Sequence, residues 1–166
     1  MIHAVERPKA SIPTHCTPEQ YAAMYRASVE TPDAFWLEQA QRLDWVRPPK
    51  QGGEWAYDPV GITWFEDGTL NLCHNAIDRH LAAHADRTAL IFEPDDPASP
   101  GRSLTYGELH REVVRMANAM KALGVAKGDR VTIYMPMILE GVVAMLACAR
   151  LGAVHSAVSY THLTLP

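Results

Sequence analysis

Apolar residues recur at helical spacing in the first third of the chain, where two Thr-Pro pairs stand at residues 17–18 and 31–32. Such a pair is typical of a helix start, because the threonine caps free backbone N–H groups and the proline fits the first helical position. Gln20 completes a capping box behind the first pair. The pattern predicts one helix from residue 17 to about Ser28 and a second that ends before Pro48.

The middle of the chain alternates between breakers and short apolar runs. Residues 47–60 combine Pro, Gly and Lys, so we expect a loop or linker there and the main internal boundary of the chain. Residues 62–65 favour a strand, and Asp67-Gly68 behind them favours a tight turn. From Asn71 to His84 the apolar positions return to helical spacing, which predicts one helix.

A strand, a loop and a long helix are predicted next, over residues 88–92, 93–101 and 105–124. The helix begins with a second capping box, from Thr105 to Glu108, and Gly124 is its expected stop. Its predicted apolar face consists of Leu109, Val113, Met116, Ala117, Met120 and Leu123.

The last third reads as strand, helix, strand: Val131–Tyr134, the apolar run Ile138–Leu151 ending at Gly152, and Ala153–Val158. So short a sequence of elements predicts a right-handed parallel βαβ crossover, and therefore an α/β fold. Parallel strands are stable when helices cover both faces and neighbouring strands cover both edges. The two predicted parallel strands lack this cover, so the sheet should be incomplete. We expect the strand at 131–134 and the following helix to expose apolar surface.

Composition and charge exclude several classes of protein. The 166 residues favour one domain, or one domain with a small appendage. Fifteen Lys and Arg against nineteen Asp and Glu give a net charge of −4, which leaves no basic excess for nucleic acid. The longest apolar run, residues 141–149, is too short to span a membrane. Residues 1–14 place charges and prolines before any apolar stretch, unlike a secretory signal, so we expect a cytoplasmic protein.

Candidate chemistry is sparse. His80 and His84 stand four residues apart, as paired metal ligands do, but the glutamate of a zinc hydrolase is missing and a solvated helix face explains both. Gly52-Gly53 precedes no helix, and residues 98–103 contain a proline, so neither favours a phosphate loop. Turn, cap, core or surface roles are expected for the other candidates, which are His74, His110, His155, Asp67, Asp78, Asp95, Asp96 and Asp129. Three distant cysteines suggest neither a disulfide framework nor a CxxC site.

Three sets of motifs together resemble the N-terminal part of the AMP-forming acetyl-CoA synthetases, within the acyl-adenylate-forming superfamily. They are TPDAFW (31–36) with WFEDGTLN (64–71) and DRHL (78–81); LTY (104–106) with KGDRV (127–131); and YMPM (134–137) with AMLACARLGAVHS (144–156). Residues 1–16 lack periodicity and contain Pro8 and Pro13, so we expect a disordered lead there. The resemblance implies the family's N-terminal segment over 17–84. The start of its AMP-binding domain would follow over 85–158.

The resemblance also implies an activity for the full-length family. Acetate attacks the α-phosphate of MgATP, and the CoA thiol then displaces AMP from acetyl-adenylate. The family's phosphate loop, its nucleotide and CoA contacts and its catalytic lysine lie downstream of the motifs found here. We therefore assign no catalytic, cofactor-binding or metal residue, and we expect a chain that binds neither ATP, Mg nor CoA and is inactive alone.

Residues 159–166, SYTHLTLP, depart from the family, which continues with Gly-Gly-Phe. They resemble a translated sequencing adapter, so we interpret them as a foreign tail, with a natural short isoform as the alternative. Two other functions stay open at this point. One is a synthetase for propionate or another short-chain acid, and the other is a non-catalytic module that binds a partner through its two N-terminal helices.

Overall fold

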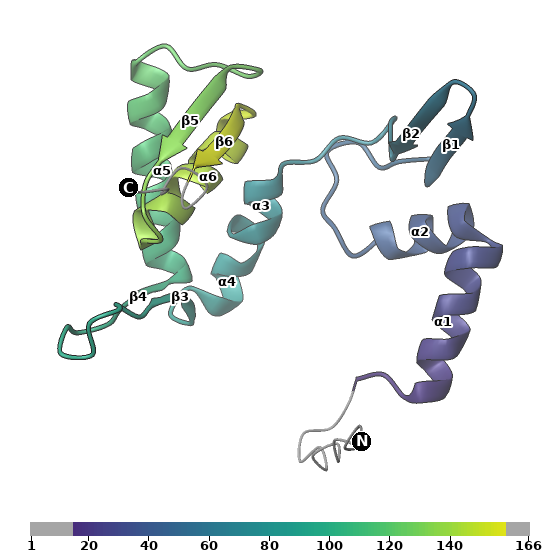
Figure 1. Ribbon diagram of the computed structural model, residues 1–166, viewed down its shortest axis with the longest axis horizontal. Helices are drawn as coiled ribbons and strands as arrows, with labels where there is room; N and C mark the ends of the chain where they lie inside the picture. The colour runs from purple at the N-terminus through teal and green to yellow at the C-terminus, as the bar shows by residue number, and fades with distance from the viewer. Residues whose placement is uncertain (1–14, 159–166) are drawn as a thin grey trace, which may run out of the picture. The chain divides into compact units, whose positions relative to one another are not determined.

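The computed structural model describes residues 15–158, which divide into two compact units (Figure 1). Unit 1 comprises the chain up to Arg42 together with Pro48–Gly68, and unit 2 comprises Leu43–Arg47 and the chain from Thr69 onward. One division, between Arg47 and Pro48, falls at the start of the stretch 47–60 where a boundary was expected, and the rest of that stretch belongs to unit 1. The predicted lead up to residue 14 and the predicted foreign tail lie outside the described residues.

Two helices begin unit 1, α1 (Pro18–Glu30) and α2 (Pro32–Ala40). The first capping box is confirmed: the Gln20 backbone N–H donates to Thr17 Oγ1 at 3.2 Å, and the Thr17 N–H donates to Gln20 Oε1 at 2.8 Å. Contrary to expectation, the Thr31 side chain does not cap α2. Its hydroxyl donates instead to the Ala27 carbonyl at the end of α1, so it closes the first helix.

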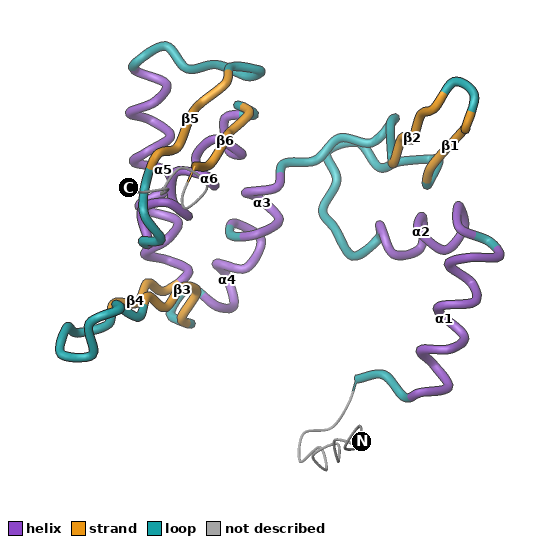
Figure 2. Tube along the Cα trace, viewed as in Figure 1, coloured by secondary structure: helices purple, strands orange, loops and turns teal. Residues whose placement is uncertain are grey.

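A hairpin of β1 (Gly53–Tyr57) and β2 (Val60–Trp64) completes unit 1 (Figure 2). The strand before the turn at residues 66–68 is confirmed, whereas the loop expected over 47–60 contains β1. Glycine and proline around Trp55 and Tyr57 conceal the strand in the sequence, although aromatic residues favour strands. Gly53 is required for close packing, because a Cβ there would lie 2.5 Å from the Trp64 ring.

Unit 2 opens with α3 (Leu72–Ala76), the 3₁₀ turn η1 (Asp78–His80) and α4 (Leu81–His84), where the sequence predicts one continuous helix. The helix breaks at Ile77, whose φ and ψ are −127° and −64°. The Ile77 side chain is only 1% exposed. Departure from helical geometry at this residue therefore coincides with insertion of its side chain into the core.

The next predicted strand, loop and helix are all present, and the structure adds a second strand between the loop and the helix. Strands β3 (Thr88–Phe92) and β4 (Arg102–Thr105) form an antiparallel pair, with the predicted loop between them, and α5 (Tyr106–Ala122) follows. The second capping box is confirmed. Leu109, Val113 and Ala117 are buried, but Leu123 is 86% exposed and does not belong to the apolar face. It caps the helix just before the chain reverses at Gly124, whose φ is +93°.

The βαβ crossover consists of β5 (Arg130–Tyr134), α6 (Leu139–Leu151) and β6 (Val154–Val158), with the strands parallel. This confirms the α/β class. Each sheet in the described chain has two strands, which agrees with an incomplete domain. Gly152 ends α6 with a φ of +74°, a left-handed conformation that favours glycine.

The core of unit 2 lies where α6 packs on α5, α3 and the strands. Tyr134 and Val154 are exposed on β5 and β6, as is Met137 after β5. By contrast no residue of α6 is fully exposed: its neighbours cover it on several sides, and the apolar side chains that it leaves in part accessible include Val142, Met145 and Leu146. Within residues 15–158, no helix combines the length and apolar character needed to cross a bilayer.

Candidate functional site

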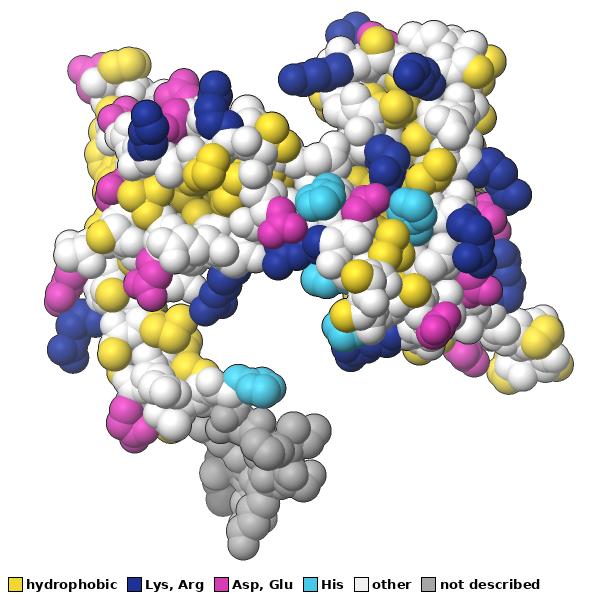
Figure 3. Space-filling view, turned by 180° about the vertical axis from the view of Figure 1, so that it is seen from behind, with side chains coloured by type: hydrophobic (Ala, Val, Ile, Leu, Met, Phe, Trp, Pro, Cys, Tyr) yellow, Lys and Arg dark blue, Asp and Glu magenta, His cyan; other side chains and the backbone are white. Residues whose placement is uncertain are grey.

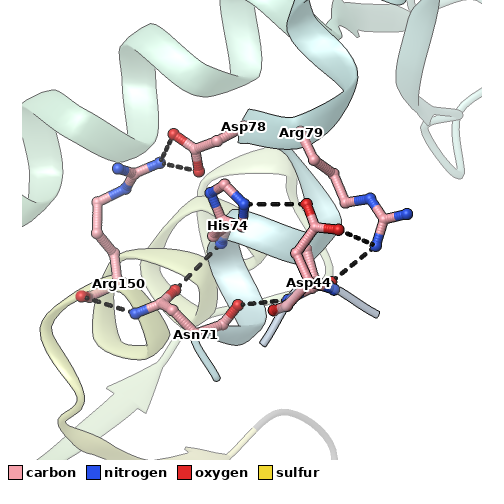
Figure 4. A network of polar contacts seen from close by, with 7 residues as sticks. Asp44, Asn71, His74, Asp78, Arg79 and Arg150 are labelled. Carbon is pink, nitrogen blue, oxygen red and sulfur yellow. Dashed lines mark hydrogen bonds and ion pairs between the residues drawn. The ribbon is translucent and has the colours of Figure 1, made fainter. Parts of the chain in front are cut away.

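Polar contacts in unit 2 gather around α3, η1 and the end of α6 (Figure 4). Their centre is an ion pair in which Arg150 Nη2 donates to both carboxylate oxygens of Asp78, at 2.8 and 2.6 Å. The two side chains are only 26% and 23% exposed. His110 Nε2 from α5 lies 3.3 Å from Asp78 Oδ1, so one carboxylate joins three elements.

The ion pair shifts the titration of both partners. Partial burial disfavours the Asp78 carboxylate, but the hydrogen bonds and charge of Arg150 outweigh this effect and lower the pKa of Asp78. Burial also opposes the charge of Arg150, and the Asp78 carboxylate outweighs it and raises the pKa of Arg150. Both groups are therefore charged at neutral pH. Arg150 Nε is buried without a hydrogen-bond partner among the described residues.

Two buried cysteines lie in this core. Burial raises the pKa of the Cys73 thiol, and the nearby charge of Arg150 opposes this effect only in part. Burial likewise raises the pKa of Cys148. Because nucleophilic attack requires the thiolate, and because both side chains are fully buried, neither thiol fits a catalytic role.

Asp44 anchors residues 43–47 to α3 and η1. Its carboxylate lies 3.3 Å from His74 Nε2 and 3.5 Å from Arg79 Nη1. Its backbone N–H donates to Asn75 Oδ1 at 2.8 Å, and Asn75 Nδ2 donates to the Asp44 carbonyl at 2.9 Å. The carboxylates of Asp44 and Asp78 thus each hold separate segments of unit 2 together. On the surface of unit 2, histidine side chains lie beside acidic and basic ones (Figure 3).

Asn71 uses both ends of its amide. Its Oδ1 accepts from the His74 backbone N–H at 3.1 Å, which caps α3. Its Nδ2 donates to the carbonyls of Ala149 and Arg150 at 3.1 and 3.2 Å, at the end of α6. These carbonyls are among the last four of a helix, which have no partner within the helix itself.

The residues considered in the sequence as metal ligands or as a phosphate loop make structural contacts in the described chain. The rings of His80 and His84 stack with centroids 6.5 Å apart. No group of three or more His, Cys, Asp or Glu within residues 15–158 is placed to hold a metal ion. The Gly52 N–H donates to Asp33 Oδ1 at 2.6 Å, and a Cβ at Gly52 would lie 2.7 Å from the Asp33 carbonyl oxygen. Close packing therefore explains a glycine at that position.

The turn role predicted for the aspartates is confirmed for Asp96 and Asp129, which accept from the backbone N–H groups of Ala98 and Ala126 at 3.0 and 2.8 Å. Asp78 differs, since it belongs to the ion pair described above. His155 lies on β6, opposite Val131 of β5.

A groove of about 670 Å³ runs beside α5 and the start of α6. Arg102 Nη2 donates to Glu140 Oε1 at 2.8 Å there, and this hydrogen bond lowers the pKa of Glu140. Three arginines and three glutamates line the groove. Their charges cancel, so the groove has no net positive charge to attract a phosphate group.

Family comparisons agree with this architecture. The model described as "AMP-binding enzyme" matches residues 77–164, more than half of the chain. The chain therefore belongs to the AMP-binding enzyme family. A second family model, described as "Acetyl-coenzyme A synthetase N-terminus", matches residues 21–76 of the chain. The two matches adjoin at residues 76 and 77, inside the polar network. None of the divisions between the two compact units, at 42/43, 47/48 and 68/69, falls there.

Individual relatives point the same way. An acetyl-coenzyme A synthetase of Yersinia pestis (strain Pestoides F) is 53% identical over 153 residues, which are 90% of this chain and 23% of the relative. One from Xanthomonas campestris pv. campestris (strain 8004) is 55% identical over 144 residues, 86% of this chain and 22% of the relative. The chain thus spans about a quarter of these relatives.

A solved structure, the acetoacetyl-CoA synthetase from Streptomyces lividans, superposes with a TM-score of 0.73 at 34% identity. The superposition covers 84% of this chain and 21% of that one. The resemblance found in the sequence is confirmed, and the comparisons do not favour a non-catalytic module or a synthetase for another short-chain acid.

Proposed function

We propose that this chain is the N-terminal quarter of an AMP-forming acetyl-CoA synthetase. The observation that carries the proposal is the succession, in one chain, of a match to the synthetase N-terminus over residues 21–76 and a match to the AMP-binding enzymes over 77–164. Acetate is favoured over other acids because relatives named acetyl-coenzyme A synthetase are 53% and 55% identical, against 34% for the acetoacetyl-CoA synthetase.

The proposed reaction has two steps. An acetate oxygen attacks the α-phosphorus of ATP and pyrophosphate leaves, and the CoA sulfur then attacks the acetyl carbonyl carbon and AMP leaves. Magnesium and positively charged groups would stabilise the charge on the phosphates. We assign none of these roles to residues of this chain, whose network and βαβ crossover support the fold. The chain alone is accordingly proposed to be inactive.

Two further proposals concern the chain's setting. A cytoplasmic location is supported by the three cysteines, Cys16, Cys73 and Cys148, which are all free thiols.

Residues 159–166 are proposed to be foreign, although the AMP-binding match runs to residue 164. Sequencing the gene from independent DNA tests this proposal: a Gly-Gly-Phe continuation supports it, and a genuine SYTHLTLP codon run contradicts it.

A chimaera tests the proposed function. In the Yersinia pestis relative, the 153 matched residues are replaced by those of this chain, and AMP formation is measured with acetate and without it. We expect acetate turnover within about tenfold of the parent, a change of about 1.4 kcal/mol in the activation barrier. The control is the relative without the segment, which should be inactive. A folded chimaera that forms no acetate-dependent AMP contradicts the proposal.

A further inference from the structure

Residues 43–47 and 69–76, which we call the strap, meet at the base of the excursion formed by residues 48–68. The Val46 and Arg47 N–H groups donate to the Thr69 carbonyl at 2.8 and 3.1 Å, and the Thr69 N–H donates to the Arg47 carbonyl at 2.9 Å. The chain therefore leaves for the β1–β2 hairpin and returns from it at a hydrogen-bonded pair of residues. Both halves of the strap cluster with unit 2.

The strap is fixed at two further places. Asp44 contacts His74, Asn75 and Arg79 across about thirty positions of sequence. Asn71 reaches the last turn of α6, 78 residues further along the chain. Two of these contacts, Asp44 with Arg79 and Asn71 with the end of α6, join residues that match the synthetase N-terminus to residues that match the AMP-binding enzymes.

We infer that the strap is an integral part of the AMP-binding unit, and that Asn71 is the positioning residue that couples it to the end of α6. The turn after α6 leads directly into β6, and its amides are held locally: the Gly152 N–H donates to the Ala149 carbonyl and the Ala153 N–H to the Cys148 carbonyl. Asn71 binds the Ala149 carbonyl beside them. The N-terminal segment thereby sets the point from which β6 starts.

The two ends of the Asn71 amide allow a local cap to be separated from a long-range coupling. Aspartate is as good an N-cap as asparagine, so Asn71→Asp retains the acceptor for the His74 N–H. The same substitution removes the Nδ2 donor and places a carboxylate against the helix carbonyls, where negative charge is unfavourable. A residue that only caps α3 tolerates the change, whereas a coupling residue does not.

Hydrogen exchange of single amides in the whole chain distinguishes these roles. In Asn71→Asp we expect the Gly152 and Ala153 amides to exchange about tenfold faster or more, as befits two lost hydrogen bonds, with the His74 amide nearly unchanged. The matched control is Asn118→Asp on the exposed side of α5. The coupling role is overturned if the amides of residues 152 and 153 exchange in Asn71→Asp at the same rates as in the wild type and in the control variant.

The wild-type protein provides a second measurement, should the variant fail to fold. In exchange at increasing denaturant, the amides of Val46, Arg47 and Thr69 should open together with those of α6. Opening together with the amides of the β1–β2 hairpin would place the strap in unit 1 and overturn the inference.

Discussion

Asp78→Asn removes the carboxylate charge at the centre of the network while preserving side-chain size. Arg150 then remains as a positive charge without its counter-ion. The charge is partly buried, because both side chains of the pair are less than one-third exposed. Charge-assisted hydrogen bonds contribute more than neutral ones, and loss of the pair should lower the free energy of unfolding of unit 2 by about 2 kcal/mol. The assay is hydrogen exchange of α5 in urea, which follows unit 2 separately from unit 1.

The matched control is Glu112→Gln, which removes a carboxylate from the Glu112–Arg115 pair on the surface of α5. The Arg115 side chain of that pair is 77% exposed, so solvent screens the interaction and the loss should stay below about 0.5 kcal/mol. Equal losses in the two variants would refute the reasoning, because they would show that the partial burial of Asp78 and Arg150 has no energetic effect.

The pH dependence gives the same prediction an independent test. Because Arg150 lowers the pKa of Asp78 in the folded state, the stabilisation is fully present above the unfolded pKa, about 3.9, and is lost as pH falls through the folded value. The difference between wild type and Asp78→Asn should therefore be constant near neutral pH and shrink toward pH 3 and below. A difference that persists unchanged in strong acid would exclude the ion pair as its cause.

Three further predictions concern packing, capping and thiol chemistry. Ile77→Ala should lower the free energy of unfolding by about 3 kcal/mol in urea titrations, whereas Ile91→Ala, at a site 77% exposed, should change it by less than about 0.5 kcal/mol; similar losses would contradict the core position. Glu108→Ala removes the capping-box carboxylate and should cost about 1 kcal/mol in the same titrations, and no loss would show that the cap is dispensable. With a thiol reagent, exposed Cys16 should react at once and the buried thiols only on unfolding; three equally fast thiols would contradict the burial.

Local signals in the sequence account for much of the fold. The capping box at Thr105 and Glu108 and the stop at Gly124 define α5, because each acts within a few residues. The βαβ crossover was equally predictable, since an apolar helix between two β-rich runs leaves few alternatives. By contrast the break at Ile77 coincides with burial in a core that contains Val113 and Val143, which are distant in the sequence. Strand β1 was missed although it pairs with the neighbouring β2, because glycine and proline around it favour a loop.

The polar network was missed for the same reason. Asp78 and Arg150 are 72 residues apart, and Asn71 and Ala149 are 78 apart, so their pairing depends on the tertiary fold. One signal was present: Arg150 is the charged residue that ends an otherwise apolar run, where a buried partner is expected. The absence of an assigned catalytic residue remains a prediction.

The most direct test of the central claim is an assay of the purified chain with acetate, MgATP and CoA, followed by release of pyrophosphate. If these residues support the fold and the reacting groups belong to other parts of the enzyme, release should stay at the level without acetate. The chimaera assayed in parallel should release pyrophosphate in an acetate-dependent manner. Acetate-dependent release by the chain alone would contradict the account.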